Sequence, residues 1–103
     1  MEDVSVQRWD ENFQPDEAAI RLRMGQEGLS PFQWSNGPGD TYPAHAHSYH
    51  KVIYVVRGSI TFGLPAKGTT IQLNQGDRLE LPAGIVHDAI VGGQGVVCLE
   101  GHR

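Results

Sequence analysis

The stretch GDTYPAHAHSYHKVIYVVRG, residues 39–58, decides the fold, because it joins a cluster of histidines to an apolar run. Three of the chain's five histidines, His45, His47 and His50, fall inside it. The run at 52–56 consists of β-branched and aromatic residues, which favour a β-strand. Both alternating faces of this strand are apolar, whereas a strand with one wet face alternates apolar with polar residues. We therefore expect the outer face to be covered by an N-terminal helix or a second subunit, and we predict a homodimer.

His45 and His47 are two residues apart, and such residues point to the same face of a strand. Their imidazoles can therefore converge on one metal ion, and imidazole nitrogen suits Zn, Fe, Ni, Cu and Mn. The alternative interpretation is a hydrogen-bonded pair of surface histidines. The pair alone does not decide between the two.

Beyond this stretch, turn-forming residues recur about every ten residues and separate short apolar segments. This pattern predicts an all-β fold, either an antiparallel sandwich or a small barrel. We expect Arg57-Gly58 to turn the chain, so that residues 59–64 form a hairpin with 52–56. A further turn is expected at residues 92–95, which contain three glycines.

The N-terminal part of the chain has a different pattern. Pro15 at the first helical position, acidic residues in the first turn and Gly28 as the stop predict a helix over 15–27. Residues 18–24 also alternate as in a strand, but the signals at the two ends favour the helix. We predict an N-terminal arm and helix at 1–28 followed by a β-barrel at 29–103, within one domain overall.

Composition argues against several classes of function. The net charge is −4, with 12 acidic and 8 basic residues, whereas a protein that binds the nucleic-acid backbone normally presents a basic face. The sequence has no apolar run that could span a membrane and no signal-peptide pattern. Its single cysteine, Cys98, cannot form an intramolecular disulfide. We predict a cytoplasmic protein that binds neither nucleic acid nor membranes.

A second stretch, GDRLELPAGIVH at residues 76–87, completes the argument. Together with residues 39–58 it resembles the two signature motifs of the cupin superfamily. The first motif is Gly, five residues, His-x-His, three or four residues, Glu, six residues and Gly. The second is Gly, five residues, Pro-x-Gly, two residues, His, three residues and Asn. Eight positions fall on register, namely Gly39, His45, His47, Gly58, Gly76, Pro82, Gly84 and His87.

The resemblance implies a small antiparallel β-barrel of the double-stranded β-helix or jelly-roll type, to which the N-terminal helix is added. It also implies one divalent transition metal (Zn, Fe, Ni, Mn or Cu) inside the barrel, bound by His45, His47 and His87. The superfamily hosts many chemistries, so the resemblance does not specify a reaction.

Two positions depart from the family pattern. The glutamate ligand falls on Lys51, or on Val52 in the longer spacing, and the final asparagine falls on Val91. By strand parity Lys51 points inward with the histidines, while His50 points outward. A charged Lys51 ammonium about 5 Å from a divalent ion would repel it by roughly 6–7 kcal/mol at an effective dielectric constant of about 20.

Four arrangements would resolve this repulsion. The Lys51 amine could lose its proton, its stem could carry it to the barrel mouth, an anion could sit between it and the metal, or no metal is bound. We predict the second and third together. Lys51 then binds an anionic ligand, such as a carboxylate, beside a metal with open coordination positions.

Two classes of function fit this sequence. A metal-dependent enzyme, namely an oxygenase, isomerase or lyase, would convert a small anionic metabolite. A non-enzymatic binding or sensor module would bind the metabolite without turnover, and the loss of the family's glutamate and asparagine favours this alternative. No residue is assigned as catalytic, because no nucleophile triad or phosphate loop is visible. Trp34 and Tyr49 could line a pocket, although core packing is the usual role of such aromatics, and we expect His102 in solvent.

Overall fold

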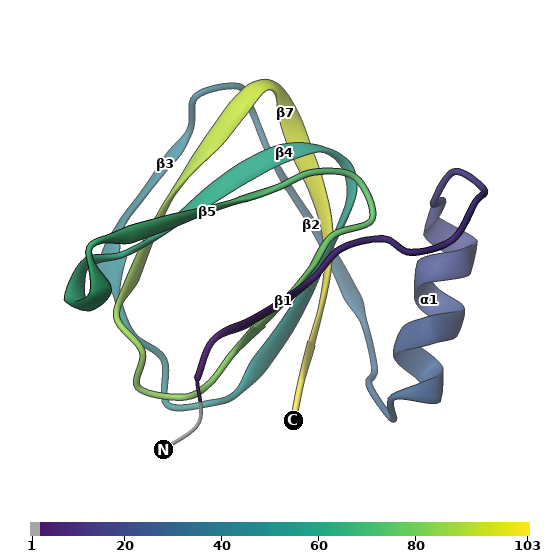
Figure 1. Ribbon diagram of the computed structural model, residues 1–103, viewed down its shortest axis with the longest axis horizontal. Helices are drawn as coiled ribbons and strands as arrows, with labels where there is room; N and C mark the ends of the chain where they lie inside the picture. Colours follow the sequence, from purple (N-terminus) through teal and green to yellow (C-terminus); the bar gives the residue numbers. More distant parts are fainter. Residues whose placement is uncertain (1–2) are drawn as a thin grey trace.

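The computed structural model describes residues 3–103, so the first two residues of the expected N-terminal arm lie outside it. The described chain forms β1 (Ser5–Gln7), α1 (Glu17–Gln26), β2 (Phe32–Asn36), β3 (Thr41–His45), β4 (Lys51–Leu64), a 3-10 turn (Pro65–Lys67), β5 (Thr69–Leu73), β6 (Arg78–Leu81) and β7 (His87–His102). The strands curve around a common interior, and α1 lies outside them on one side (Figure 1). The helix is too short to cross a membrane, and the described chain contains no other α-helix.

All strand pairs are antiparallel. The strand order is β1-β6-β4-β7-β2, with β3 added alongside β7 and β5 alongside β4. The predicted all-β fold of the double-stranded β-helix or jelly-roll type, with an N-terminal helix, is confirmed. Because β1 pairs with β6, the N-terminal arm contributes a strand to the common sheet. The division of the chain into 1–28 and 29–103 stays a prediction.

The two longest strands correct the expected turns. Residues 52–56 and 59–64 do not form a hairpin, because both belong to the continuous strand β4, and residues 92–95 lie within β7. The β4–β7 register shifts on both sides of Gly58, as at a β-bulge. Gly58 has φ +78°, and a Cβ atom there would lie 2.0 Å from the Gly95 carbonyl oxygen. The glycine therefore bends the strand and allows close backbone approach, and the chain does not reverse.

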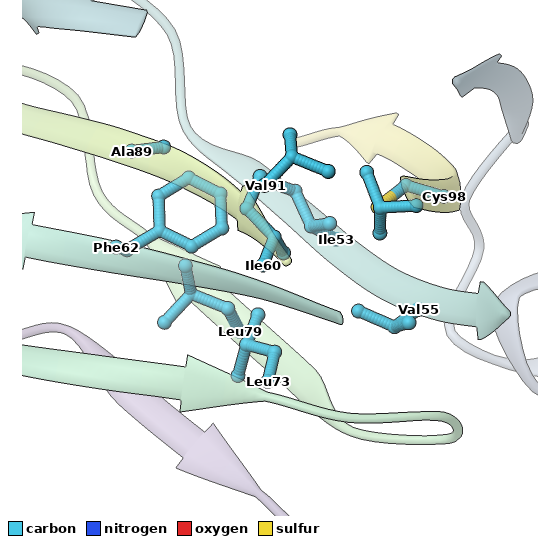
Figure 2. Close-up of a cluster of buried hydrophobic side chains, with 10 residues drawn as sticks. Ile53, Val55, Ile60, Phe62, Leu73, Leu79, Ala89, Val91 and Cys98 are labelled. Carbon is cyan, nitrogen blue, oxygen red and sulfur yellow. The ribbon is translucent and has the colours of Figure 1, made fainter. Parts of the chain in front are cut away.

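Two apolar clusters lie on opposite faces of the sheet. The inner cluster fills the space between the curved strands and includes Val96. Figure 2 shows its other members pointing toward one another: Ile53, Val55, Ile60, Phe62, Leu73, Leu79, Ala89, Val91 and Cys98. The outer cluster joins α1 to the sheet through Ile20, Met24, Leu29, Val52, Tyr54, Val56 and Leu99. Strand β4 is thus covered on both faces, as its sequence predicts, and α1 covers the outer one. Of the two expected coverings of this outer face, an N-terminal helix or a second subunit, the helix of the same chain provides it.

Helix α1 begins and ends close to the predicted positions. Asp16 is the N-cap, and its side chain accepts a hydrogen bond from the Ala19 N–H at 2.8 Å, so Pro15 precedes the helix instead of opening it. At the other end, Gly28 has φ +78°, its N–H donates to the Gly25 carbonyl, and the Leu29 N–H donates to the Met24 carbonyl. This is a Schellman motif, in which glycine relieves the strain of a left-handed residue. The helix is thereby fixed so that its buried side chains face β4.

Candidate metal centre

His45 ends strand β3, where it is the register partner of His87, the first residue of β7. The Nδ1–H of His45 donates to the Pro43 carbonyl at 2.6 Å. In the same way, the Nδ1–H of His87 donates to the Ile85 carbonyl at 2.9 Å. A carbonyl oxygen can only accept, so each bond places the proton on Nδ1 and leaves the Nε2 of a neutral ring with a free lone pair.

His47 lies two residues beyond the end of β3, in the irregular segment that connects β3 to β4. The expectation that His45 and His47 lie on one strand and share its face is therefore wrong, because His47 is outside the strand. The two ring centroids nevertheless lie only 4.7 Å apart. The carbonyl of His47 accepts a hydrogen bond from the Gly84 N–H at 2.8 Å. This bond ties the first histidine segment to the Pro-x-Gly turn that precedes His87, so the two motifs meet in space.

The three predicted histidines form one cluster. Each offers a ligand nitrogen, and these nitrogens lie within 4.8 Å of one another. The ring centroid of His87 is 4.4 Å from that of His45 and 5.3 Å from that of His47. Atoms held this close could converge on a single metal ion with little rearrangement.

The Nε2 atom of His87 gives the sharpest indication of a missing partner. His87 is 2% exposed, and within residues 3–103 its Nε2 is the buried side-chain nitrogen or oxygen for which no hydrogen-bond partner is found. A buried polar atom is normally paired. A metal ion bound between the rings would pair it, and the second nitrogen of the same ring is already held by a carbonyl, as is usual for metal-binding histidines. The residues present therefore fit a metal ion.

Burial also favours the protonation state that a metal needs. It lowers the pKa of His87, and the nearby Lys51 adds to this effect. Burial likewise lowers the pKa of His47, again with a contribution from Lys51. Both rings are therefore more readily neutral at pH 7 than a free histidine, and a neutral imidazole is the metal-binding form.

A cavity of about 270 Å³ opens from the histidine cluster into the interior of the curved sheet. Its walls are mainly aromatic and aliphatic, and its lining residues are Phe32, Trp34, Tyr42, His45, His47, Lys51, Ile60, Phe62, His87, Ala89 and Glu100. Trp34 therefore lines the cavity. Tyr49 stacks on His47 with 4.8 Å between the ring centroids.

Lys51 lies in this cavity, as strand parity predicts, but it does not reach out to the barrel mouth. Its side chain is only 10% exposed, and its Nζ lies 3.8 Å from the Oε1 of Glu100. Burial lowers the pKa of Lys51, and the Glu100 carboxylate opposes this effect. The anion beside Lys51 is thus the carboxylate of Glu100, a residue of the same chain.

Sequence reasoning did not single out Glu100. Its carboxylate is 7% exposed and accepts hydrogen bonds from the Trp34 Nε1–H at 3.0 Å and from the His102 Nε2–H at 2.6 Å. The sequence contained one signal for Glu100. It lies two residues after Cys98 on an apolar strand, and residues i and i+2 point to the same face of a strand, so a buried Cys98 places Glu100 on the inner face. His102 is exposed, as expected, and it is also bonded to Glu100, while its ring centroid lies 4.2 Å from that of Tyr49. His50 points away from this cavity and binds Glu80 at 2.7 Å.

Comparisons with known proteins agree on the fold. The family model for the cupin domain matches residues 33–102. A DUF861 family protein from Thermotoga maritima is 12% identical, with a TM-score of 0.65 over 98% of this chain and 100% of its own. The polyketide cyclase RemF from Streptomyces resistomycificus is 26% identical, with a TM-score of 0.63 over 72% of this chain. The DMSP lyase DddQ from Ruegeria pomeroyi is 21% identical, with a TM-score of 0.65 over 73% of this chain.

The matched region spans 54% of the cyclase chain and 38% of the lyase chain. The similarity thus leaves much of each of these longer chains unmatched. The comparison with curated proteins finds no match.

Proposed function

This chain belongs to the cupin domain family, and we propose that it binds one divalent transition metal through ring nitrogens of His45, His47 and His87. In the same proposal, the adjoining cavity binds or converts a small anionic metabolite, and Lys51 is a ligand-binding residue. The clustering of three ring nitrogens within 4.8 Å beside a cavity supports both parts.

One observation carries the metal proposal, namely the unpartnered Nε2 of His87. A buried polar atom without a partner costs on the order of 1–3 kcal/mol. The ring cannot turn away without losing its bond to the Ile85 carbonyl. A metal ion between the three rings would satisfy this atom in its present position.

The donor set narrows the choice of metal. Three imidazole nitrogens suit Zn, Fe, Ni, Cu or Mn better than Mg or Ca, which prefer oxygen ligands. When bound, such an ion would polarise a ligand oxygen as a Lewis acid, and a redox-active ion would also support dioxygen chemistry. The chain's own contribution is to hold the rings neutral and oriented and to surround the ligand with apolar walls.

Charge and size support a small anionic ligand. Three neutral imidazoles leave the two charges of a divalent ion uncompensated, so an anionic oxygen next to the ion would be favoured. The cavity of about 270 Å³ is slightly smaller than the usual volume of small-molecule sites, about 300–1,000 Å³. Two of the similar structures carry the names of enzymes, a polyketide cyclase and a DMSP lyase, which supports a small-molecule ligand.

The alternative is a non-enzymatic binding or sensor module. It is favoured by Lys51, which occupies the position of the family's glutamate ligand and is paired with Glu100. The Glu100 carboxylate opposes the lowering of the Lys51 pKa by burial, and a protonated lysine cannot act as a proton acceptor. Under this alternative the cavity binds the metabolite and releases it unchanged.

Metal reconstitution tests the proposal and separates the two alternatives. Protein stripped with a chelator is titrated in turn with Zn(II), Ni(II), Mn(II), Cu(II) and, without oxygen, Fe(II). Calorimetry and elemental analysis should give one ion per chain for at least one of these metals, and binding of none rejects the proposal. Small carboxylic acids are then added, and their NMR signals are followed with time. Broadened signals that persist support the binding module, whereas loss of signal with new product peaks supports an enzyme.

The homodimer and the cytoplasmic location stay predictions. The outer face of β4 is already covered by α1, so a dimer would have to use another surface. Light scattering at micromolar concentration checks the oligomeric state directly.

A further inference from the structure

Lys51 and Glu100 occupy neighbouring positions on two paired strands. Lys51 of β4 is the register partner of His102 in β7, and Glu100 is the partner of Ile53. The two residues are thus diagonal neighbours, and both line the cavity that adjoins the histidine cluster. Their side chains are 10% and 7% exposed, so this pair is a buried feature of the cavity wall.

The two members of the pair differ in how they are bonded. Each carboxylate oxygen of Glu100 accepts one hydrogen bond, from Trp34 or from His102, and these bonds hold the group in place. The Nζ of Lys51 lies 3.8 Å from Glu100, which is too far for a hydrogen bond. No hydrogen bond from this ammonium group is found anywhere in residues 3–103. Its N–H donors are therefore available to a ligand.

We infer that Lys51 and Glu100 together form a second polar subsite, which binds an uncharged hydroxyl or carbonyl group of the ligand and disfavours a carboxylate. The inference rests on the proposed function, because it assigns the anionic end of the ligand to the three histidines and the uncharged polar end to this pair. The ligand class is then a small hydroxy acid or oxo acid, and not a dicarboxylic acid.

Electrostatics explains the selectivity. A ligand carboxylate that approached Lys51 would also approach Glu100, so attraction to one charge and repulsion from the other would largely cancel. A hydroxyl or carbonyl oxygen carries no net charge and can accept from Lys51 without that repulsion. A hydroxyl group can in addition donate to a remaining lone pair of the Glu100 carboxylate.

Three probes of equal chain length test the subsite, namely butyrate, 4-hydroxybutyrate and succinate. Their binding to the Zn(II)-reconstituted protein is measured by calorimetry. We expect 4-hydroxybutyrate to bind about tenfold more tightly than butyrate, the gain that one hydrogen bond to a charged group implies. Succinate should bind no more tightly than butyrate. A wild-type protein that prefers succinate, or that does not distinguish the three, overturns the inference.

Two substitutions give readouts that a merely structural role would not produce. In Glu100→Gln the charge of Lys51 is no longer compensated, so the preference should reverse, with succinate binding more tightly than 4-hydroxybutyrate. In Lys51→Met the advantage of 4-hydroxybutyrate over butyrate should disappear. Glu17→Gln removes an exposed carboxylate on α1 and should leave the ranking unchanged. If Glu100→Gln keeps the wild-type ranking, the inference is wrong, and if that variant does not fold, the wild-type ranking and Lys51→Met decide.

Elemental analysis of the same samples separates failure of the subsite from failure of the metal proposal. A protein without metal that still ranks the three probes as expected retains the subsite and rejects the metal proposal. A protein with one zinc ion per chain and a preference for succinate retains the metal proposal and rejects the subsite.

Discussion

His45 and His87 are direct partners across β3 and β7, and their ring centroids lie 4.4 Å apart. Each ring is held by the carbonyl of the residue two positions before it, Pro43 for one and Ile85 for the other. The same local device thus acts on two facing strands, and it leaves both Nε2 atoms free to bind a metal. His47 completes the cluster from the irregular segment that follows β3.

Removing either of these two rings should abolish tight metal binding. We expect His45→Ala and His87→Ala to weaken the affinity for Zn(II) more than about a hundredfold, beyond the 10–100-fold cost of losing only a hydrogen-bond partner of a ligand. Competition with a chromophoric chelator measures the affinity. His50→Gln is the matched control, since His50 binds Glu80 outside the cavity. Unchanged zinc affinity in both alanine variants would exclude these residues as ligands.

Gly84 should stabilise the fold because glycine adopts a left-handed backbone conformation without strain. Its N–H also donates a hydrogen bond to the His47 carbonyl and so helps to position His47. Gly84 has φ +82°, and a Cβ atom there would meet no atom within 4 Å. Gly84→Ala should therefore cost about 1–2 kcal/mol through backbone strain alone, and lower the melting temperature by roughly 4–8 °C for each kcal/mol. Thermal unfolding measures the effect.

Gly93→Ala is the control for this substitution, because its Cβ position is equally open and its φ is not positive. It should leave the melting temperature nearly unchanged or raise it slightly. Equal losses in the two variants would mean that the conformation of Gly84 is not what stabilises the turn.

Cys98 should be chemically inert in the folded protein. Burial raises the pKa of its thiol from 9.0 to about 12, and the thiolate is the reactive form. Iodoacetamide at pH 8 should therefore label the chain only after urea unfolds it, as followed by mass spectrometry. Between pH 9 and 12 the unfolded chain loses a thiol proton that the folded chain keeps, so the free energy of unfolding falls as the pH rises.

The Cys98→Ala variant isolates this contribution. Its free energy of unfolding, measured by urea titration from pH 8 upward, should decline less steeply than that of the wild type. Rapid labelling of the folded wild type at pH 8 would contradict the assignment of Cys98 to the core.

Helix α1 should stabilise the fold through its buried face only. Met24 is fully buried against β4, whereas Leu22 is 65% exposed. We expect Met24→Ala to lower the free energy of unfolding by about 2–5 kcal/mol and Leu22→Ala to change it by less than about 0.5 kcal/mol. Urea titration measures both values. A small effect of Met24→Ala would show that α1 does not cover the outer face of β4.

The sequence predicted those parts of the site whose residues lie at fixed spacings within a motif or along a strand. His45, His47 and His87 were found from the two motifs, and the inward direction of Lys51 followed from strand parity. The outer face of β4 was recognised as covered, and the stop at Gly28 marked the end of α1. These features depend on local periodicity and on the turn chemistry of single residues.

Other features depend on pairing between distant segments and could not be derived in this way. The glycine at position 58 looks the same in a sequence whether it reverses a strand or bends it, and only its contact with Gly95 decides. Glu100 belongs to no motif, and its importance comes from Trp34, Lys51 and His102, which reach it from β2, β4 and the end of β7.

Anomalous diffraction at the absorption edge of the metal tests the central claim most directly. Crystals of metal-reconstituted protein should give one anomalous peak per chain, within coordination distance of ring nitrogens of His45, His47 and His87. Data collected above and below the edge identify the element. Crystals without such a peak, or with the peak bound by other side chains while the three rings point apart, would contradict the account.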